Sequence, residues 1–90
     1  MDILVIHTRD NVAVLLVATE PGTTLGAGDV TVRALDAIPS GHKIALRDIP
    51  AGTLVIKYGE AIGRAKVSIR AGSHVHVHNL ESLRGRGDLV

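Results

Sequence analysis

The sequence predicts a single all-β domain made of many short strands and loops. Its 90 residues are enough for one small hydrophobic core but too few for a two-domain enzyme. The apolar side chains are mostly valine, isoleucine and leucine, and β-branched side chains favour pleated strands over helices. Glycine and proline interrupt the chain at short intervals, so we expect no helix longer than about two turns.

The first half of the chain predicts an N-terminal hairpin and one further strand. Residues 2–8 and 12–19 are apolar runs of strand type, and the polar residues 9–11 between them predict a short turn. Residues 20–29 contain one proline and three glycines, which predicts a loop or β-turn with little regular structure. Residues 30–35 alternate apolar and polar side chains, as in a strand with one solvated face.

The second half continues as short strands separated by tight turns. A single helical turn is expected at residues 46–49, because Pro50 and Gly52 would stop it. Turns that contain glycine are expected at residues 39–41, 58–60 and 70–73. The strands expected in this half are residues 42–45, 54–57, 62–65 and 74–79.

The chain divides into a domain and a tail. Residues 1–80 are predicted to form the domain, an all-β unit that ends where the strand-like runs end. Residues 81–90 are predicted to be a flexible C-terminal tail, since the charged, glycine-rich stretch 84–88 cannot bury its own backbone. The tripeptide at residues 86–88 matches an adhesion motif, which we take as a coincidence in an intracellular protein.

Composition excludes several classes of protein. With 46% hydrophobic residues, 21% charged residues and a net charge of +1, the chain is a folded domain rather than a disordered one. It has no cysteine, which excludes disulfides and thiolate metal sites and favours a reducing, cytoplasmic location. The apolar runs are far shorter than the ~20 residues that span a bilayer, so no membrane is expected as a partner. The single aromatic residue, Tyr58, and the balanced charge argue against nucleic-acid binding.

Three of the five histidines lie at alternate positions, His74, His76 and His78. Side chains in a strand alternate between faces, so these imidazoles would share one face while Val75 and Val77 face the core. Same-face neighbours lie roughly 6.6 to 6.8 Å apart, a spacing at which two imidazoles can converge on one ion. The pattern therefore predicts a divalent metal site with two histidine ligands, and a third histidine that acts as a base or contacts substrate.

Other interpretations of these polar residues stay open. The histidine face can simply be solvated or hydrogen-bond a partner, and spacing does not select among zinc, iron and manganese. His42 and Lys43 begin a strand after a turn, where they can move a proton or hold a carboxylate, but they also fit a surface basic pair. Tyr58 follows Lys57 and can line a site, or it can be a core residue with its hydroxyl at the rim.

Four blocks of the sequence carry a resemblance to a known family: DNVAV at 10–14, GHKIALRDI at 41–49, VIKYGEAIG at 55–63 and AGSHVHVHN at 71–79. In this order they resemble the N-terminal domain of the altronate and galactarate dehydratase family of sugar-acid hydro-lyases. The same blocks resemble the small subunit of sulfolactate sulfo-lyase almost as closely. The resemblance covers nearly the whole chain, and four ordered blocks are more specific than any single motif.

The resemblance implies a SAF-type β-clip fold, in agreement with the short strands expected above. It also implies an incomplete enzyme, because in fused members a large catalytic domain follows this module. The chain would then be the small subunit of a two-component dehydratase, acting with a separate large subunit in a homo- or hetero-oligomer. The alternating histidines favour the altronate or sulfolactate branch over the galactarate branch.

The implied reaction is β-elimination from a 2,3-dihydroxy sugar acid or a 3-sulfo analogue. A base removes the proton α to the carboxylate, water or sulfite leaves from the neighbouring carbon, and the enol becomes a 2-keto acid. A divalent cation, expected to be Fe2+ or Mn2+, would stabilise the developing charge as a Lewis acid. The implied roles are metal ligation by His74 and His76, catalysis by His42, Lys43 and His78, and substrate binding by Lys57, Tyr58 and Asn79.

Two other functions stay open at the level of the sequence. One is a non-catalytic carbohydrate-binding or assembly module, in which the histidine face binds a sugar acid or seals an interface. The other is a free-standing metal-binding β domain with its own activity. Production of a 2-keto acid only in the presence of a large subunit would distinguish the dehydratase subunit from both.

Overall fold

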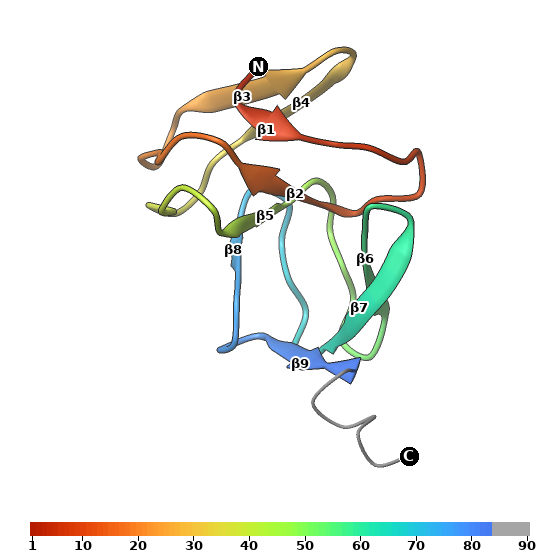
Figure 1. Ribbon diagram of the computed structural model, residues 1–90. Helices are drawn as coiled ribbons and strands as arrows, with labels where there is room; N and C mark the ends of the chain where they lie inside the picture. Colours follow the sequence, from red (N-terminus) through yellow and green to blue (C-terminus); the bar gives the residue numbers. More distant parts are fainter. Residues whose placement is uncertain (84–90) are drawn as a thin grey trace.

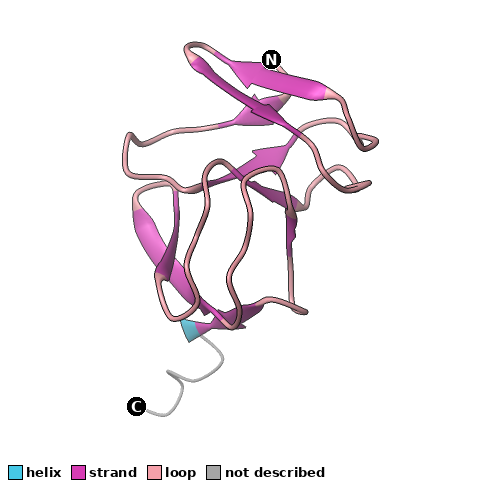
Figure 2. Ribbon diagram, turned by 180° about the vertical axis from the view of Figure 1, so that it is seen from behind, coloured by secondary structure: helices cyan, strands magenta, loops and turns pink. Residues whose placement is uncertain are grey.

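The computed structural model describes residues 1–83, and residues 84–90 of the predicted tail lie outside the described part. Strands and loops make up nearly all of the described chain, which confirms the all-β prediction (Figure 1, Figure 2). The helical turn predicted at residues 46–49 is wrong, because the segment is a bend from which Ile49 forms an antiparallel bridge with Ile69. No helix within residues 1–83 is long and apolar enough to span a membrane.

A four-stranded antiparallel sheet forms the centre of the fold. Its strands are β1 (Ile3–Leu4), β2 (Val12–Leu15), β5 (Lys43–Ala45) and β8 (His74–Val75). The strand order is β1-β2-β5-β8, so β5 pairs with both β2 and β8. The pairing of β1 with β2 confirms the predicted N-terminal hairpin.

Two further sheets lie on either side of the central one (Figure 1). The first is the hairpin of β3 (Thr24–Ala27) and β4 (Val30–Arg33). The second contains β6 (Leu54–Lys57), β7 (Glu60–Ala65) and β9 (Leu80–Ser82), with β7 in the middle. β4, β6 and β7 lie where the sequence predicts strands. β9 extends to Ser82 and so includes the first two residues of the segment predicted as a tail.

The strand β3 corrects the prediction of an irregular loop at residues 20–29. Its register pairs Leu25 with Val32 of β4, and both side chains are buried. Glycine inside the strand removes one side chain from the alternating pattern, so the local sequence resembles a loop although the pairing is regular.

The hydrophobic core has two parts, separated by the central sheet. The first lies between this sheet and the β3–β4 hairpin, and the second lies toward β6, β7 and β9. Val12 and Ala13 are neighbours in β2 with 0% exposure each, which shows that both faces of the sheet are covered. The first part contains Ile3, Ala13, Leu15, Leu25, Val32, Ala34, Ile38 and Ile44. The second contains Val12, Ala45, Ile49, Val55, Ala65, Ile69 and Val75.

The two halves of the chain repeat one backbone pattern. The isolated bridge between Thr19 and Ile38 in the first half corresponds to the Ile49–Ile69 bridge in the second. In each half, a hairpin lies between the two residues that form the bridge. After the second bridge residue comes a turn with a positive-φ glycine, and a strand of the central sheet follows this turn. Gly41 precedes β5 in this way and Gly72 precedes β8, so the two paired strands beside the histidines begin alike.

Asp10 and Asn11 join the N-terminal hairpin to the β6–β7 hairpin. Asp10 Oδ1 accepts a hydrogen bond of 2.7 Å from the Gly59 N–H, and its Oδ2 accepts two from Ile6 and His7 at 3.2 and 3.1 Å. These last two bonds explain why β1 is shorter than the predicted run, since the amides serve a side chain instead of a neighbouring strand. Asn11 donates to the Leu54 carbonyl and accepts from the Ile56 N–H, at 3.0 and 2.7 Å.

Burial raises the pKa of Asp10, but hydrogen bonds from the backbone of Gly59, His7, Ile6 and Tyr58 outweigh it and hold the pKa below its ordinary value of 3.8. The charged form is thus favoured in the folded state. Its contribution to stability is complete above about pH 4 and is lost as the pH falls through the lowered pKa.

We predict that Asp10→Asn lowers the free energy of unfolding by about 1–3 kcal/mol at pH 7, because an amide NH2 would face backbone N–H donors. The loss should shrink as the pH falls below 3.8, where the wild type loses the same charge. Urea unfolding between pH 7 and pH 2.5 measures both effects. Asp29→Asn, on the exposed β3–β4 turn, is the control. An Asp10→Asn variant as stable as this control would contradict the assigned role.

Gly72 is the second position where the fold allows little change. A Cβ there would collide with the carbonyl oxygen of Arg33, and the residue has a φ of 90°. Gly52 has a similar φ of 85° but open space around it. A substitution at Gly52 therefore measures the cost of the positive φ without a steric collision. We predict that Gly52→Ala costs about 1–2 kcal/mol and that Gly72→Ala costs several times more or prevents folding. Equal thermal stability of the two variants would show that the contact with Arg33 is unimportant.

Candidate metal and substrate site

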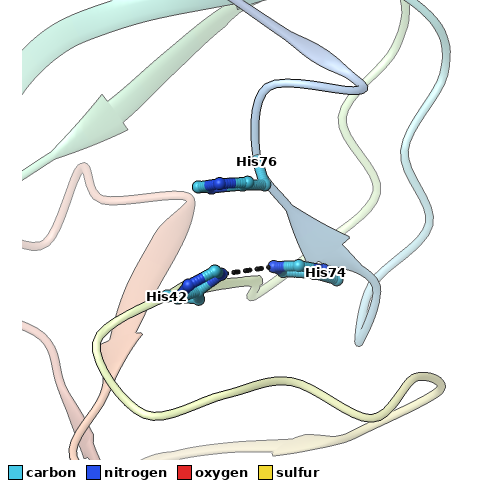
Figure 3. A group of neighbouring side chains, drawn as sticks. All are labelled: His42, His74 and His76. Carbon is cyan, nitrogen blue, oxygen red and sulfur yellow. Dashed lines mark hydrogen bonds between the residues drawn. The ribbon is translucent and has the colours of Figure 1, made fainter.

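Three imidazoles meet at the end of the central sheet. The side chains of His42, His74 and His76 are each partly buried, and one ligand nitrogen from each lies within 4.8 Å of the others (Figure 3). His42 Nδ1 lies 2.9 Å from His74 Nε2, a hydrogen bond in which one ring donates and the other accepts. The rings of His42 and His76 stack with centroids 4.4 Å apart. We call these three residues the imidazole group.

The pairing of β5 with β8 builds this group. It is antiparallel, with Ile44 opposite His74 and Lys43 opposite Val75. The same register continued by one residue places His42 opposite His76, which agrees with the stacking of their rings. His42, the residue before β5, therefore joins the histidines of the last block although it lies 32 residues from His74 in the sequence.

The strand predicted at residues 74–79 is wrong beyond Val75. The chain turns there, because the side chain of Asn79 accepts a hydrogen bond from the His76 N–H and donates to the His74 carbonyl, both at 2.9 Å. Val75 is buried as predicted, but Val77 is 70% exposed instead of facing the core. The histidines therefore gather through a turn and a strand pairing, and not through alternation along one strand.

His78 and Asn79 have different positions relative to the imidazole group. His78 is exposed, and its ring centroid lies 5.4 Å from that of His74 at a tilt of 49°. It lies beside the group without being part of it. The amide of Asn79 is buried and bonded to the backbone at both ends, which gives it a positioning role in the turn. Substrate contact by Asn79 stays a prediction.

The surroundings favour the neutral form of two imidazoles. Burial lowers the pKa of His74, and the neighbouring His42, His78 and His76 lower it further, while Asp36 acts in the opposite direction. Burial also lowers the pKa of His76, with added contributions from His42, Lys43 and His78. At neutral pH these rings keep a free nitrogen lone pair, the form that accepts a proton or binds a metal ion.

A cleft of about 750 Å³ opens beside the imidazole group. Four of the predicted site residues line it, namely Lys43, Lys57, Tyr58 and His76. Burial lowers the pKa of Lys43, and the positive charge of Lys57 lowers it further. Two ammonium groups that repel one another across a cleft are a suitable pair for a substrate carboxylate. The rest of the lining is Glu60, Ala61, Ile62, Val77, Leu80, Ser82 and Leu83.

Tyr58 lies at the rim of the cleft and not in the core. It is 36% exposed, and Lys57 Nζ lies 5.0 Å from the centroid of its ring. Its φ of 56° is the positive value that non-glycine residues rarely adopt, at a cost of about 1 kcal/mol or more. The bonds from Asp10 to this turn hold the strained conformation. Such strain beside a cleft is a common feature of functional sites.

The sequence missed two carboxylates that serve this site. Asp10 fixes the turn that carries Tyr58, and Asp36 accepts a 2.8 Å hydrogen bond from the His74 N–H. Asp10 begins the block DNVAV at 10–14, which carries the resemblance without indicating this role, and Asp36 lies outside the four blocks. Their position before or after an apolar run is the only local signal that they carry.

Comparison with known proteins agrees with the resemblance found in the sequence. The altronate/galactarate dehydratase SAF domain family matches residues 1–83. Altronate dehydratase of Escherichia coli K12 is 47% identical over 79 residues, which are 88% of this chain and 16% of that protein. The chain thus spans about one sixth of the length of this relative.

Two shorter relatives are (2R)-sulfolactate sulfo-lyase alpha subunits. That of Chromohalobacter salexigens is 57% identical over 49 residues, 54% of this chain and 52% of the relative. That of Paracoccus pantotrophus is 45% identical over 56 residues, 62% of this chain and 84% of the relative. Together with the match over residues 1–83 and the all-β architecture, these findings show that the chain belongs to the altronate/galactarate dehydratase SAF domain family, within a group of lyases.

Proposed function

We propose that this chain is the small subunit of a two-component sugar-acid dehydratase. With a separate large subunit it would eliminate water from a 2,3-dihydroxy acid such as altronate and give a 2-keto-3-deoxy acid. The observation that carries the proposal is the imidazole group beside a cleft lined by Lys43, Lys57 and Tyr58, on a chain whose relatives are lyases. The two-component arrangement is supported by relatives of similar size whose names contain "subunit alpha".

The imidazole group fits a divalent metal ion, for which we propose Fe2+ or Mn2+. Two nitrogens bound side by side to one ion at about 2.1 Å each lie about 3.0 Å apart in an octahedral shell. The 2.9 Å between His42 Nδ1 and His74 Nε2 matches this spacing. His74, His76 and His42 would be the ligands, and such an ion, when bound, supplies Lewis-acid stabilisation of charge on the substrate carboxylate and hydroxyl.

The other predicted residues take roles that their positions allow. Lys43 and Lys57 would bind the substrate carboxylate, which relieves their mutual repulsion. His78, exposed beside His74, would move a proton as general base or acid. The proton leaves the α-carbon, and the hydroxyl of the neighbouring carbon departs as water after it accepts a proton. The hydroxyl of Tyr58 would hydrogen-bond a substrate oxygen at the cleft rim.

A second candidate is the small subunit of a sulfolactate sulfo-lyase, because alpha subunits of such enzymes match this chain at 45–57% identity. The residue roles would be the same, and sulfite would leave in place of water. Assays with altronate and with sulfolactate, with detection of 2-keto acid and of sulfite, distinguish the two candidates. A chain that binds sugar acid but supports neither reaction would be a non-catalytic module.

We predict that the isolated chain binds one Mn2+ or Fe2+ ion and that His76→Ala weakens the affinity at least tenfold, because one of three imidazole ligands is lost. His7→Ala is the matched control, since His7 is exposed and lies outside the imidazole group. Isothermal titration under anaerobic conditions measures both. Equal affinities in the His76→Ala variant and the wild type would contradict the ligand assignment.

We predict that 2-keto acid forms when the chain is combined with a large dehydratase subunit that has no SAF domain of its own. In this complex His78→Ala should lower kcat about 10²–10⁴-fold, as for loss of a general acid or base. Lys57→Ala should mainly raise KM, because it removes a carboxylate contact. If His76→Ala and His78→Ala both left turnover and metal content unchanged, the imidazoles would have no part in the reaction.

A further inference from the structure

Asp36 contacts the imidazole group from a segment that lies far from it in the sequence. Its Oδ2 accepts a hydrogen bond of 2.8 Å from the backbone N–H of His74, 38 residues along the chain. We propose that Asp36 is a positioning residue, which fixes the first residue of β8 and thereby holds the ring of His74 against His42. Its effect on metal binding rests on the function proposed above, whereas its effect on the rings does not.

Backbone contacts hold residues 33–36 against the turn that precedes β8. The Leu35 N–H donates to the Gly72 carbonyl at 2.8 Å, one residue before Asp36. On the other side of this contact, Gly72 has no room for a Cβ because the carbonyl of Arg33 lies against it. The segment 33–36 is therefore packed onto the turn that starts β8, and the carboxylate of Asp36 meets the His74 amide at its end.

Asp36 also brings a negative charge to the imidazole group, whose three members are histidines. The imidazole group contains three histidines, and Lys43 contributes a positive charge that acts on His76. Asp36 is the carboxylate that acts favourably on a positive charge at His74. A divalent ion held by neutral imidazoles would bring two further positive charges, which a nearby carboxylate offsets.

Asp48 provides a matched control on the same turn. Its Oδ1 accepts a hydrogen bond of 2.9 Å from the Ala71 N–H, so it makes the same kind of contact with the segment that precedes β8. Both aspartates are exposed, which makes their replacement compatible with folding. Asp48 is not among the groups that act on the pKa of His74 or His76. A variant of Asp48 therefore shows the effect of losing a contact with this turn, without loss of a charge that acts on the imidazoles.

The first test uses the metal-free chain. Nuclear Overhauser contacts between the ring protons of His42 and His74, and the exchange rate of the His74 amide, report whether the ring is held. We expect Asp36→Ala to lose the ring contact and to speed amide exchange at least tenfold. Asp36→Asn keeps an acceptor oxygen and should retain the contact, and Asp48→Ala, which removes the matched hydrogen bond to Ala71, should leave it unchanged. Wild-type contacts and exchange in Asp36→Ala would overturn the proposal.

The second test is titration with Co2+, an air-stable stand-in for Fe2+ that binds imidazole sites more tightly. We expect the dissociation constant to rise 10- to 100-fold in Asp36→Ala, as for loss of a residue that orients a ligand, and to change less than twofold in Asp48→Ala. An unchanged constant in Asp36→Ala would count against the proposal. If the wild type bound no Co2+, the proposed metal function would fail, and the ring contacts alone would decide the role of Asp36.

Discussion

The pairing of β5 with β8 is the interaction on which the site depends. Ile44 lies opposite His74 and Val75 lies opposite Lys43 in this pairing. Ile44 and Val75 have 0% exposure each and belong to the two different parts of the core. A slip of one residue would exchange the faces of β8, which would remove Val75 from the second part of the core and turn His74 toward that part. Burial of one valine is worth about 1.5–3 kcal/mol, so the core itself selects the register. That register brings His42 to His74 and His76.

The cleft depends on a second set of contacts, made by Asp10 and Asn11. Three side-chain hydrogen bonds of these two residues join the start of β2 to the β6–β7 hairpin. Two more, both made by Asp10, hold their own turn. The hairpin carries Lys57 and Tyr58, so its attachment to the central sheet decides how far these side chains lie from the imidazole group. Core packing thus positions the imidazole group, and the buried polar contacts of Asp10 and Asn11 position Lys57 and Tyr58 on the other side of the site.

The sequence predicts those elements whose signal is local. The N-terminal hairpin, β4 and β6 follow from apolar runs and polar turns, and two of the three alternating histidines, His74 and His76, belong to the imidazole group. The predictions fail where a side-chain hydrogen bond or the pairing with a distant strand determines the course of the backbone. The amide of Asn79 bends the chain after Val75, although residues 74–79 alternate like a strand. The place of His42 in the group follows from strand pairing, which no spacing within one block shows.

The position of the site explains why the proposed function includes a second subunit. β8 is the last strand of the central sheet and has two residues, so the imidazoles stand at an edge and stay partly exposed. Within residues 1–83 the grouped ligands are histidines alone, and Val77 beside the cleft is 70% exposed. A chemical step that develops charge is favoured when water is excluded and the polar groups are fixed. The domain covers both faces of its sheet with its own hairpins, whereas the edge that carries the imidazoles stays partly exposed, which supports the proposal of a second subunit at this edge.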